Sequence, residues 1–292
     1  MTKKIVLAGF GNPLLQLLRH WINHFMISGV IVDYDRRGKH SWFYSELEKE
    51  NVPVITFEEL KTIEVDVIIV FNYNRIIDIT LIDEKIQILN IHMGLLPLYR
   101  GNFANAWSIL NGDLTVGYSL HAVSESLDAG EIFYTFKYEI KEGETYINAK
   151  NAINKDIFEH LPRKLIQVID GEIKGTSQVG EQFTYASQLY PEDGIIDWGH
   201  STDDIFNKHI VFARPLGTGL KFMFKSKLIE ISKLSKIKNY KSSKGINGAI
   251  IFKTSMGSIW VKTQDSAISI DEIIVDGETV VPASIFKIGE RL

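Results

Sequence analysis

The sequence predicts an α/β protein in which a doubly wound, mostly parallel sheet is followed by a small β-rich domain. Short, fully apolar runs alternate with helical patterns in the first half of the chain, which is typical of parallel strands covered by helices. Short strand-like runs at close intervals dominate the C-terminal part. A length of 292 residues is long for one hydrophobic core and sufficient for two domains.

The N-terminal strands are predicted from apolar runs that end in turn residues. Residues 5–8 precede a Gly-Phe-Gly turn, and Pro13 then lies near a helix start, where its missing N–H is tolerated. Leucine and aromatic residues continue from there at helical spacing as far as Phe25. The further elements predicted in this half are a strand at 30–32 closed by Asp33, a helix at 42–50, and strands at 54–55, 66–71 and 86–91. Because ligands bind beyond the carboxyl ends of parallel strands, Asn90 and His92 are expected at a binding edge.

The middle of the chain predicts longer strands and a long helix. The elements predicted here are a helix at 103–110, strands at 116–123 and 132–140, an amphipathic helix at 144–169 and an irregular connector at 171–199. The long helix is predicted because isoleucine and leucine recur at near-helical spacing, at Ile153, Ile157, Leu161, Leu165 and Ile169.

The C-terminal part predicts a small β domain of the OB-like barrel type. A helix is expected at about 203–212, followed by strand runs at 222–224, 249–252, 258–261 and 268–270. We therefore expect a Rossmann-like catalytic domain over residues 1–198 and a small domain over residues 199–292.

Composition limits the classes of function. The chain has no cysteine, which excludes disulfides, thiolate nucleophiles and cysteine-ligated zinc. The N-terminal apolar run is too short for a signal peptide, and the chain has no run of 18 apolar residues, so we expect a cytoplasmic protein without a membrane partner. A net charge of −4 and a pI near 6.1 give no overall basic footprint of the kind that nucleic-acid-binding proteins show.

Three side chains after two strand-like runs suit the transfer of a formyl group to an amine. Asn90 can donate to the oxygen on which negative charge develops, and His92 can accept or relay a proton near neutral pH. Asp128 can orient the ring and favour its protonated form. Residues two apart on an extended strand share a side, so Asn90 and His92 can converge. The alternative is structural: an Asn-x-His pair is common, and Asp128 beside a glycine can cap a turn.

The wider pattern resembles the folate-dependent formyltransferase family. Asn90-Ile91-His92 is followed by Leu95-Leu96-Pro97-Leu98-Tyr99-Arg100-Gly101 and then by Asp128-Ala129-Gly130, in the order and spacing of that family's motifs. Trp107, Asn111-Gly112, Gly117 and His121 also match. Residues 4–9 and 66–68 are similar to the family's first and fourth strands, and residues 191–198 to the junction before its C-terminal domain, so the resemblance covers essentially the whole chain.

The resemblance implies N10-formyltetrahydrofolate as the formyl donor, no metal, and Asn90, His92 and Asp128 as the catalytic residues. The donor contacts implied by position are Arg75, Ile76, Ile77, Gly94, Leu95, Leu96, Pro97, Asn102, Ser124, Glu125, Ser126, Leu127 and Asp128. Two departures concern this set. Met93-Gly94 replaces the family's Pro or Gly followed by Ser, which removes a hydroxyl, and Asn102 stands where a sugar-nucleotide-acting relative carries Arg.

Three hypotheses for the acceptor follow. The first is the amine of a nucleotide-linked amino sugar, such as a 4-amino-4,6-dideoxy sugar used for surface glycans; it fits the acidic pI and the aromatic segment 41–45. The second is methionyl-tRNA, and the third is a non-catalytic folate-binding module, against which the intact trio argues. The residues expected to contact the substrate are Gly9, Phe10, Gly11, Trp42, Tyr44 and Arg100. A homodimer is a further expectation.

Other candidates have simpler interpretations. Lysines between residues 221 and 244 form either a phosphate-binding surface for tRNA or a solvated loop, and we favour the loop (Lys221, Lys225, Lys227, Lys233, Lys236, Lys238, Lys241 and Lys244). His20 and His24 are four apart on a helix but have no third ligand nearby, so surface residues are expected. His121 is expected to be a structural histidine on a strand.

Overall fold

The computed structural model describes residues 2–32, 41–141, 144–215, 217–237, 240 and 245–292. These residues form two compact units that interleave along the sequence. Unit 1 comprises Met1–Asn105, Val116–Glu139 and Asn148–Ala186, and unit 2 comprises Ala106–Thr115, Ile140–Ile147 and Ser187–Leu292. The domain boundary expected after residue 198 stays a prediction, and Asp33, Lys238, Lys241 and Lys244 lie outside the described residues.

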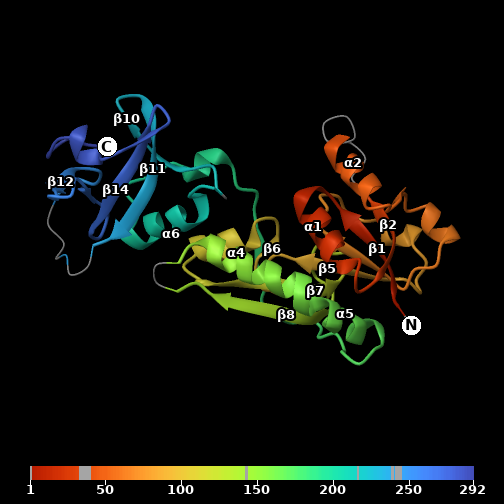
Figure 1. Cartoon of the computed structure of the whole chain (residues 1–292). Coiled ribbons are helices and arrows are strands. Elements are labelled where there is room, and N and C mark those ends of the chain that lie inside the picture. Colours follow the sequence, from red (N-terminus) through yellow and green to blue (C-terminus); the bar gives the residue numbers. More distant parts are fainter. Residues whose placement is uncertain (1, 33–40, 142–143, 216, 238–239, 241–244) are drawn as a thin grey trace. The chain divides into compact units, whose positions relative to one another are not determined.

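Unit 1 is built on a mostly parallel sheet (Figure 1). Its seven described strands lie in the order β3-β2-β1-β4-β5-β7-β8. Their bounds are β1 Lys4–Gly9, β2 Met26–Ile31, β3 Val54–Ile55, β4 Val67–Phe71, β5 Gln87–His92, β7 Thr115–Ala122 and β8 Ile132–Glu139. The first five are parallel, whereas β7 runs antiparallel to β5. The predicted α/β class is confirmed.

Alternating side chains of the central strands bury both faces of this sheet. Val6 and Ala8 share a core with Leu60 of the 3₁₀ turn η2 (Glu59–Thr62) and with Ile82, which follows the turn η3 (Ile79–Leu81). The helix α1 (Gly11–Trp21) buries its leucine stripe, and α2 (Ser41–Lys49) buries Phe43 and Leu47. The second helix was predicted within one residue of these bounds, whereas α1 ends at Trp21, four residues before the predicted Phe25.

The predicted long helix is interrupted. It consists of α4 (Tyr146–Lys155), a π-helical turn η4 (Asp156–His160) and α5 (Leu161–Ile169). Pro162 in the first turn of α5 has no N–H to donate, and its ring would clash with the carbonyl of Phe158 in a continuous α-helix. The indole of Trp21 donates to the carbonyl of Ile157 at 3.0 Å, and Tyr118 of β7 donates to the buried Asp156 at 2.6 Å. The turn therefore anchors α1 and β7 together.

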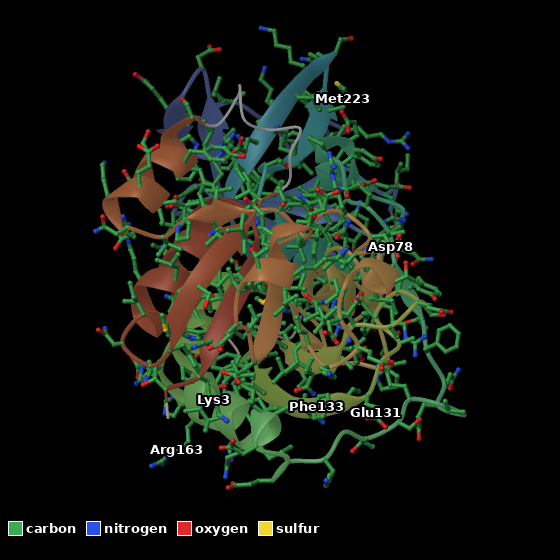
Figure 2. The ribbon with its side chains drawn as sticks, turned by 90° about the vertical axis from the view of Figure 1, so that its right-hand side faces the viewer. Lys3, Asp78, Glu131, Phe133, Arg163 and Met223 are labelled. Carbon is green, nitrogen blue, oxygen red and sulfur yellow. The ribbon has the colours of Figure 1, made fainter. Side chains whose placement is uncertain are left out.

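Unit 2 contains an antiparallel sheet and the helix α6 (Thr202–Phe212). Within the described part, five strands follow the path β10-β11-β14-β13-β12, whose ends are β10 and β12, and a sixth strand, β15, pairs with β14. Their bounds are β10 Leu220–Phe224, β11 Lys227–Lys236, β12 Ile250–Lys253, β13 Ile259–Lys262, β14 Ala267–Val275 and β15 Glu278–Val280. Met223 of β10 is 48% exposed (Figure 2), whereas its neighbour Phe222 is fully buried. The predicted β-rich C-terminal domain is confirmed.

The prediction of a solvated loop between residues 221 and 244 is wrong for its central part, because Lys227–Lys236 is strand β11. The strand was missed because its register shifts between Ile231 and Lys233 and again before Leu234. The buried Ile231 and Leu234 are consequently three residues apart, which breaks the alternation that identifies a strand.

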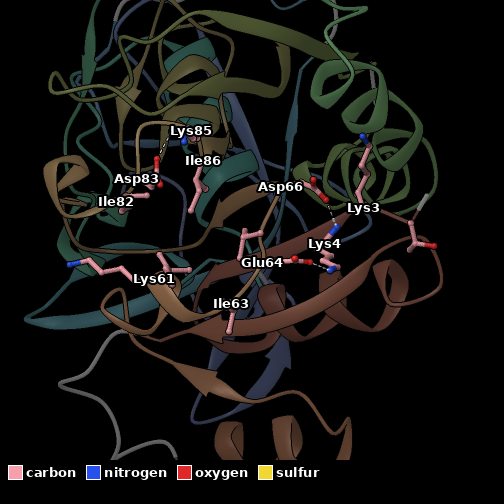
Figure 3. A pocket seen from close by; sticks show the side chains of 13 residues that line it. Lys3, Lys4, Lys61, Ile63, Glu64, Asp66, Ile82, Asp83, Lys85 and Ile86 are labelled. Atoms are coloured by element: carbon pink, nitrogen blue, oxygen red, sulfur yellow. Dashed lines mark hydrogen bonds and ion pairs between the residues drawn. The ribbon is translucent and has the colours of Figure 1, made fainter.

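The amino ends of the parallel strands border a cavity of about 680 Å³ (Figure 3). Its lining carries several charged side chains: Lys4 pairs with Glu64, and the Lys4 backbone N–H donates to Asp66 at 2.7 Å. Lys61 and Lys85 are exposed at its rim. Among the described residues, no helix is both long and apolar enough to cross a bilayer.

Candidate active site

The candidate site lies at the opposite, carboxyl edge of the same sheet, where β5 ends. Asn90 and His92 alternate with the buried Ile91 and therefore point to the same side. The antiparallel neighbour β7 sets His121 directly across from Asn90 and Ser119 across from His92. Asp128 follows β7 on the next loop. This pairing brings two histidines, an amide and a carboxylate to one place.

His92 contacts oxygen atoms through both ring nitrogens. Its Nε2 lies 3.0 Å from the backbone carbonyl of Tyr99, and its Nδ1 lies 3.3 Å from Oδ2 of Asp128. The ring is 6% exposed. The carbonyl of Tyr99 therefore faces Nε2, and the carboxylate of Asp128 faces Nδ1.

Asp128 is held by contacts from three segments. Its Oδ2 accepts from the backbone N–H of Gly101 at 2.8 Å, in addition to facing His92. Its Oδ1 lies 3.4 Å from both Nδ2 of Asn90 and Nε2 of His121. Its backbone has a left-handed φ of 50°, which aspartate tolerates better than most residues.

Burial and charge act in opposite directions on this pair. Burial lowers the pKa of His92 below its ordinary value, although the Asp128 carboxylate opposes the shift. Burial alone would raise the pKa of Asp128, but the contacts with His121, His92 and the Gly101 N–H hold it below its usual range. A neutral imidazole beside an ionised carboxylate is the state in which His92 can take up a proton.

His121 lies buried on strand β7, as predicted for a structural histidine, and it also belongs to this cluster. Its Nδ1 lies 2.7 Å from the carbonyl of Ala122, and its Nε2 lies 3.1 Å from Nδ2 of Asn90 and 3.4 Å from Oδ1 of Asp128. The amide nitrogen of Asn90 therefore already contacts His121 and Asp128, and it must share or exchange one contact to hold an oxyanion. The signal that would have found His121 is its cross-strand register with Asn90.

The loop after β5 packs closely against these residues. A Cβ at Gly94 would lie 2.4 Å from Cβ of Ala104 and 2.7 Å from Nε2 of His92, so a serine at this position would displace the ring or the helix α3 (Ala104–Leu110). Ser119 takes over a polar role here: its hydroxyl donates to the carbonyl of Gly94 at 2.9 Å and accepts from the Leu96 N–H at 3.0 Å.

The residues expected to contact the donor lie on loops at the carboxyl ends of β4, β5 and β7. Ile76 is 91% exposed and Leu127 is 53% exposed, so both apolar side chains are available to a flat ring. Ile77 and Leu96 are buried, with exposures of 9% and 7%. Of the other expected contacts, Arg75, Asn102, Glu125 and Ser126 are exposed, Leu95, Pro97 and Ser124 are half-buried, and Gly94 is buried. Their contact with the donor stays a prediction.

The residues expected to contact the acceptor are more scattered. Gly9, Phe10 and Gly11 join β1 to α1; the Phe10 ring is buried against Phe43, with ring centroids 4.8 Å apart. Trp42 and Tyr44 lie on α2, where Trp42 is 43% exposed.

Arg100 is buried rather than free to reach an acceptor. Its Nη2 donates to Oε1 of Gln178 at 2.8 Å, and its guanidinium lies 4.2 Å from the centre of the Phe183 ring. Its Nε has no hydrogen-bond partner among the described residues.

No group of three or more histidine and acidic side chains in the described residues is arranged to hold a metal ion. His20 stacks on Phe158 with ring centroids 4.4 Å apart.

Comparisons with known proteins place this geometry in a family. Residues 45–165 match the formyl transferase family, and residues 188–291 match its C-terminal domain family. A methionyl-tRNA formyltransferase from Fusobacterium nucleatum subsp. nucleatum is 30% identical over 247 residues, which cover 80% of this chain and 77% of that protein. The chain belongs to the formyltransferase family. It is accordingly a folate-dependent N-formyltransferase, and the formyl donor of this family is N10-formyltetrahydrofolate.

Solved structures share the fold at lower identity. An N-formyltransferase from Helicobacter canadensis, in complex with folinic acid and dTDP-3-aminofucose, superimposes with a TM-score of 0.68 and 18% identity, covering 92% of this chain and 99% of that one. A variant of HypX from Aquifex aeolicus superimposes with a TM-score of 0.60 and 18% identity over 98% of this chain. This chain covers 48% of HypX, so it spans about half the length of that protein.

Proposed function

We propose that this protein transfers the formyl group of N10-formyltetrahydrofolate to the primary amine of a nucleotide-linked amino sugar. The observation that carries the choice of acceptor is the pairing of lysines with carboxylates in unit 2. A tRNA-binding surface needs lysine and arginine side chains that are free to contact phosphates.

Four of the five described lysines of segment 221–244 have an acidic neighbour, two in ion pairs and two opposite a glutamate in strand register; Lys227 lies opposite Phe224. Nζ of Lys236 lies 2.6 Å from Asp203, and Nζ of Lys225 lies 3.5 Å from Glu290. Lys221 is paired across the strands with Glu230, which also holds Arg214 at 2.6 Å, and Lys233 is paired with Glu272. This alternation of sign, with the net charge of −4, disfavours a polyanionic acceptor.

The catalytic roles follow from the contacts at the carboxyl edge. The bound donor supplies an electrophilic formyl carbon. As the acceptor nitrogen bonds to that carbon, His92 takes the proton that the nitrogen loses, and Asp128 stabilises the resulting imidazolium. Asn90 donates an N–H to the oxygen that gains negative charge, and His92 returns its proton to the leaving nitrogen.

The turn at Gly9–Gly11 supports a phosphate-bearing acceptor. The amide of Asn72 donates to the Phe10 carbonyl at 2.7 Å, and α1 begins at Gly11 with its N–H groups at the carboxyl edge. Only β4 separates β1 from β5, so the turn lies roughly two strand spacings of about 4.8 Å from His92. A diphosphate at the turn would leave its sugar amine near the imidazole.

Methionyl-tRNA remains the second candidate, because the Fusobacterium relative named above carries that activity at 30% identity. The two acceptors differ in charge and size but demand the same chemistry at His92. The cytoplasmic location and the homodimer remain predictions.

The test supplies N10-formyltetrahydrofolate together with UDP-, dTDP- or GDP-linked 4-amino-4,6-dideoxy sugars, or with charged initiator tRNA, and follows formation of tetrahydrofolate and of the N-formyl product. Turnover with one of the sugar nucleotides and none with tRNA is expected. Formylation of the tRNA alone would overturn the sugar proposal and leave the formyltransferase activity intact.

A further inference from the structure

One buried side chain in the irregular connector joins both loops of the candidate site. Gln178 is 5% exposed, and its Oε1 accepts from Arg100 on the loop after β5 at 2.8 Å. Its Nε2 donates to the carbonyls of Asp128 and Gly130, on the loop after β7, at 3.1 and 2.6 Å. Each hydrogen-bonding group of the Gln178 amide is therefore used to connect the two loops.

The same connector also holds the backbone of the first loop. The short strand β9 (Tyr185–Ala186) pairs in parallel with β6 (Arg100–Gly101). The hydroxyl and the carbonyl of Thr184 accept from the N–H groups of Tyr99 and Arg100 at 3.0 and 2.9 Å. These contacts fix the carbonyl of Tyr99 that faces His92 and the N–H of Gly101 that holds Asp128.

The turn at Asp128 needs such support. Its φ of 50° is a conformation that L-residues adopt at a cost, so the turn persists only where neighbouring groups stabilise it. The carboxylate is held by Gly101, whereas the two carbonyls on either side of Ala129 are held by Gln178. Without Gln178, the two carbonyls would be left buried and unpaired, and the turn would be free to relax.

We propose that Gln178 is a positioning residue for formyl transfer, which keeps the Asp128 carboxylate against the His92 ring by bracing the turn that carries it. The proposal rests on the catalytic roles proposed above for His92 and Asp128, but it is independent of the acceptor. Gln178 touches none of the reacting atoms and acts through Asp128 and Arg100.

Two variants separate positioning from folding. Gln178→Met keeps the length of the side chain and removes all three hydrogen bonds. Gln178→Glu keeps an acceptor for Arg100 but sets a carboxylate oxygen against the carbonyls of Asp128 and Gly130. It is the variant to measure if Gln178→Met does not fold. The matched control is Gln167→Met in unit 1, where the exposed amide donates only to Glu172 at 3.2 Å. Far-UV circular dichroism and thermal unfolding report on folding.

The first readout is an NMR titration of the His92 ring, whose signal is assigned by its loss in His92→Ala. The titratable groups that face this ring are Asp128 and His121. We expect the pKa of His92 to fall below its wild-type value in Gln178→Met, because the carboxylate that raises it moves away; Gln178→Glu, which adds a carboxylate of its own, is judged by kcat. The second readout is turnover, where kcat is expected to fall about 10- to 100-fold with little change in the KM for the donor.

The outcomes distinguish this inference from the proposed function. A folded Gln178 variant whose His92 titration and kcat both match Gln167→Met would overturn the positioning role, even if the wild type is active and His92→Ala is not. A wild type that formylates only tRNA would overturn the sugar acceptor and leave the inference standing. Full activity in His92→Ala would overturn the catalytic role proposed for His92. It would overturn the positioning role of Gln178 as well, because that role acts through His92.

Discussion

Both edges of the unit 1 sheet carry basic side chains beside carboxylates, but these side chains differ in their exposure to solvent. At the amino edge, lysines and carboxylates line a cavity of about 680 Å³ (Figure 3); Lys61 and Lys85 are exposed, and Lys4 is half-buried. At the carboxyl edge, His92 and His121 are 6% and 1% exposed and share the carboxylate of Asp128. Exposed pairs are screened by water and contribute little, whereas buried pairs change the protonation of their partners. The difference shows why only the carboxyl edge is suited to proton transfer.

The largest expected effect is that of an Asp→Asn substitution at the carboxyl edge, compared with the same substitution at the amino edge. Asp128→Asn keeps the size of the side chain but removes the charge that stabilises protonated His92, so kcat is expected to fall about 10³- to 10⁴-fold. Asp66→Asn alters an exposed carboxylate that accepts from the Lys4 N–H, and its kcat is expected to stay within about twofold of wild type. Steady-state kinetics of both folded variants check this contrast, and equal losses would remove the distinction between the edges.

A smaller loss is expected when Asn90 is replaced by alanine. Removing one donor to a developing oxyanion typically lowers kcat about 10²- to 10³-fold. The KM for the donor is expected to change little, because the interaction strengthens only as charge develops. An Asn90→Ala enzyme with wild-type kcat would show that the amide serves only to hold His121 and Asp128.

The pH dependence of kcat/KM sharpens the comparison further. His92 must be neutral to take a proton, and burial holds its pKa below the ordinary value of 6.5. The rate is therefore expected to be independent of pH above about 6.5 and to fall about tenfold per pH unit well below the pKa of His92. In Asp128→Asn, the residual activity is expected to fall only at a lower pH than in the wild type. The reason is that the carboxylate that raises the pKa of His92 is gone. A value of kcat/KM that still rises with pH above 6.5 would contradict the assignment of the proton acceptor to His92.

The smallest effect is expected at the rim of the amino-edge cavity. Lys61→Ala and Lys85→Ala remove exposed side chains far along the strands from His92, so kcat and KM are expected to stay within about twofold of wild type. A tenfold rise in the KM of either substrate, measured by the same assay, would show that this edge takes part in binding.

Much of the fold followed from local patterns; one miss was a local signal that was not used, and the others depended on contacts distant in sequence. The central strands were predicted because each is a continuous apolar run, as at Val67–Phe71. Strand β11 was missed because irregular register removes its alternation, and the break in the long helix depends on Pro162. Asn90, His92 and Asp128 were recognised by their motif, and the structure brings them together. Their catalytic roles stay predictions.

His121 and Gln178 show why the rest of the site was not predicted. His121 contributes through its pairing with Asn90, which is 31 residues away in sequence, and the connection between β5 and β7 contains β6 and α3, so no hairpin pattern predicts this register. Gln178 lies 50 residues beyond Asp128 in a segment without periodicity. The importance of such residues depends on tertiary contacts that no local pattern encodes.

The most direct test of the account is the activity of His92→Ala beside the wild type, with N10-formyltetrahydrofolate and the acceptor that the wild type uses. We predict that tetrahydrofolate formation falls by about 10²- to 10⁴-fold while the variant keeps its circular dichroism spectrum and cooperative unfolding. Turnover close to that of the wild type would contradict the assignment of proton transfer to the carboxyl edge of the sheet.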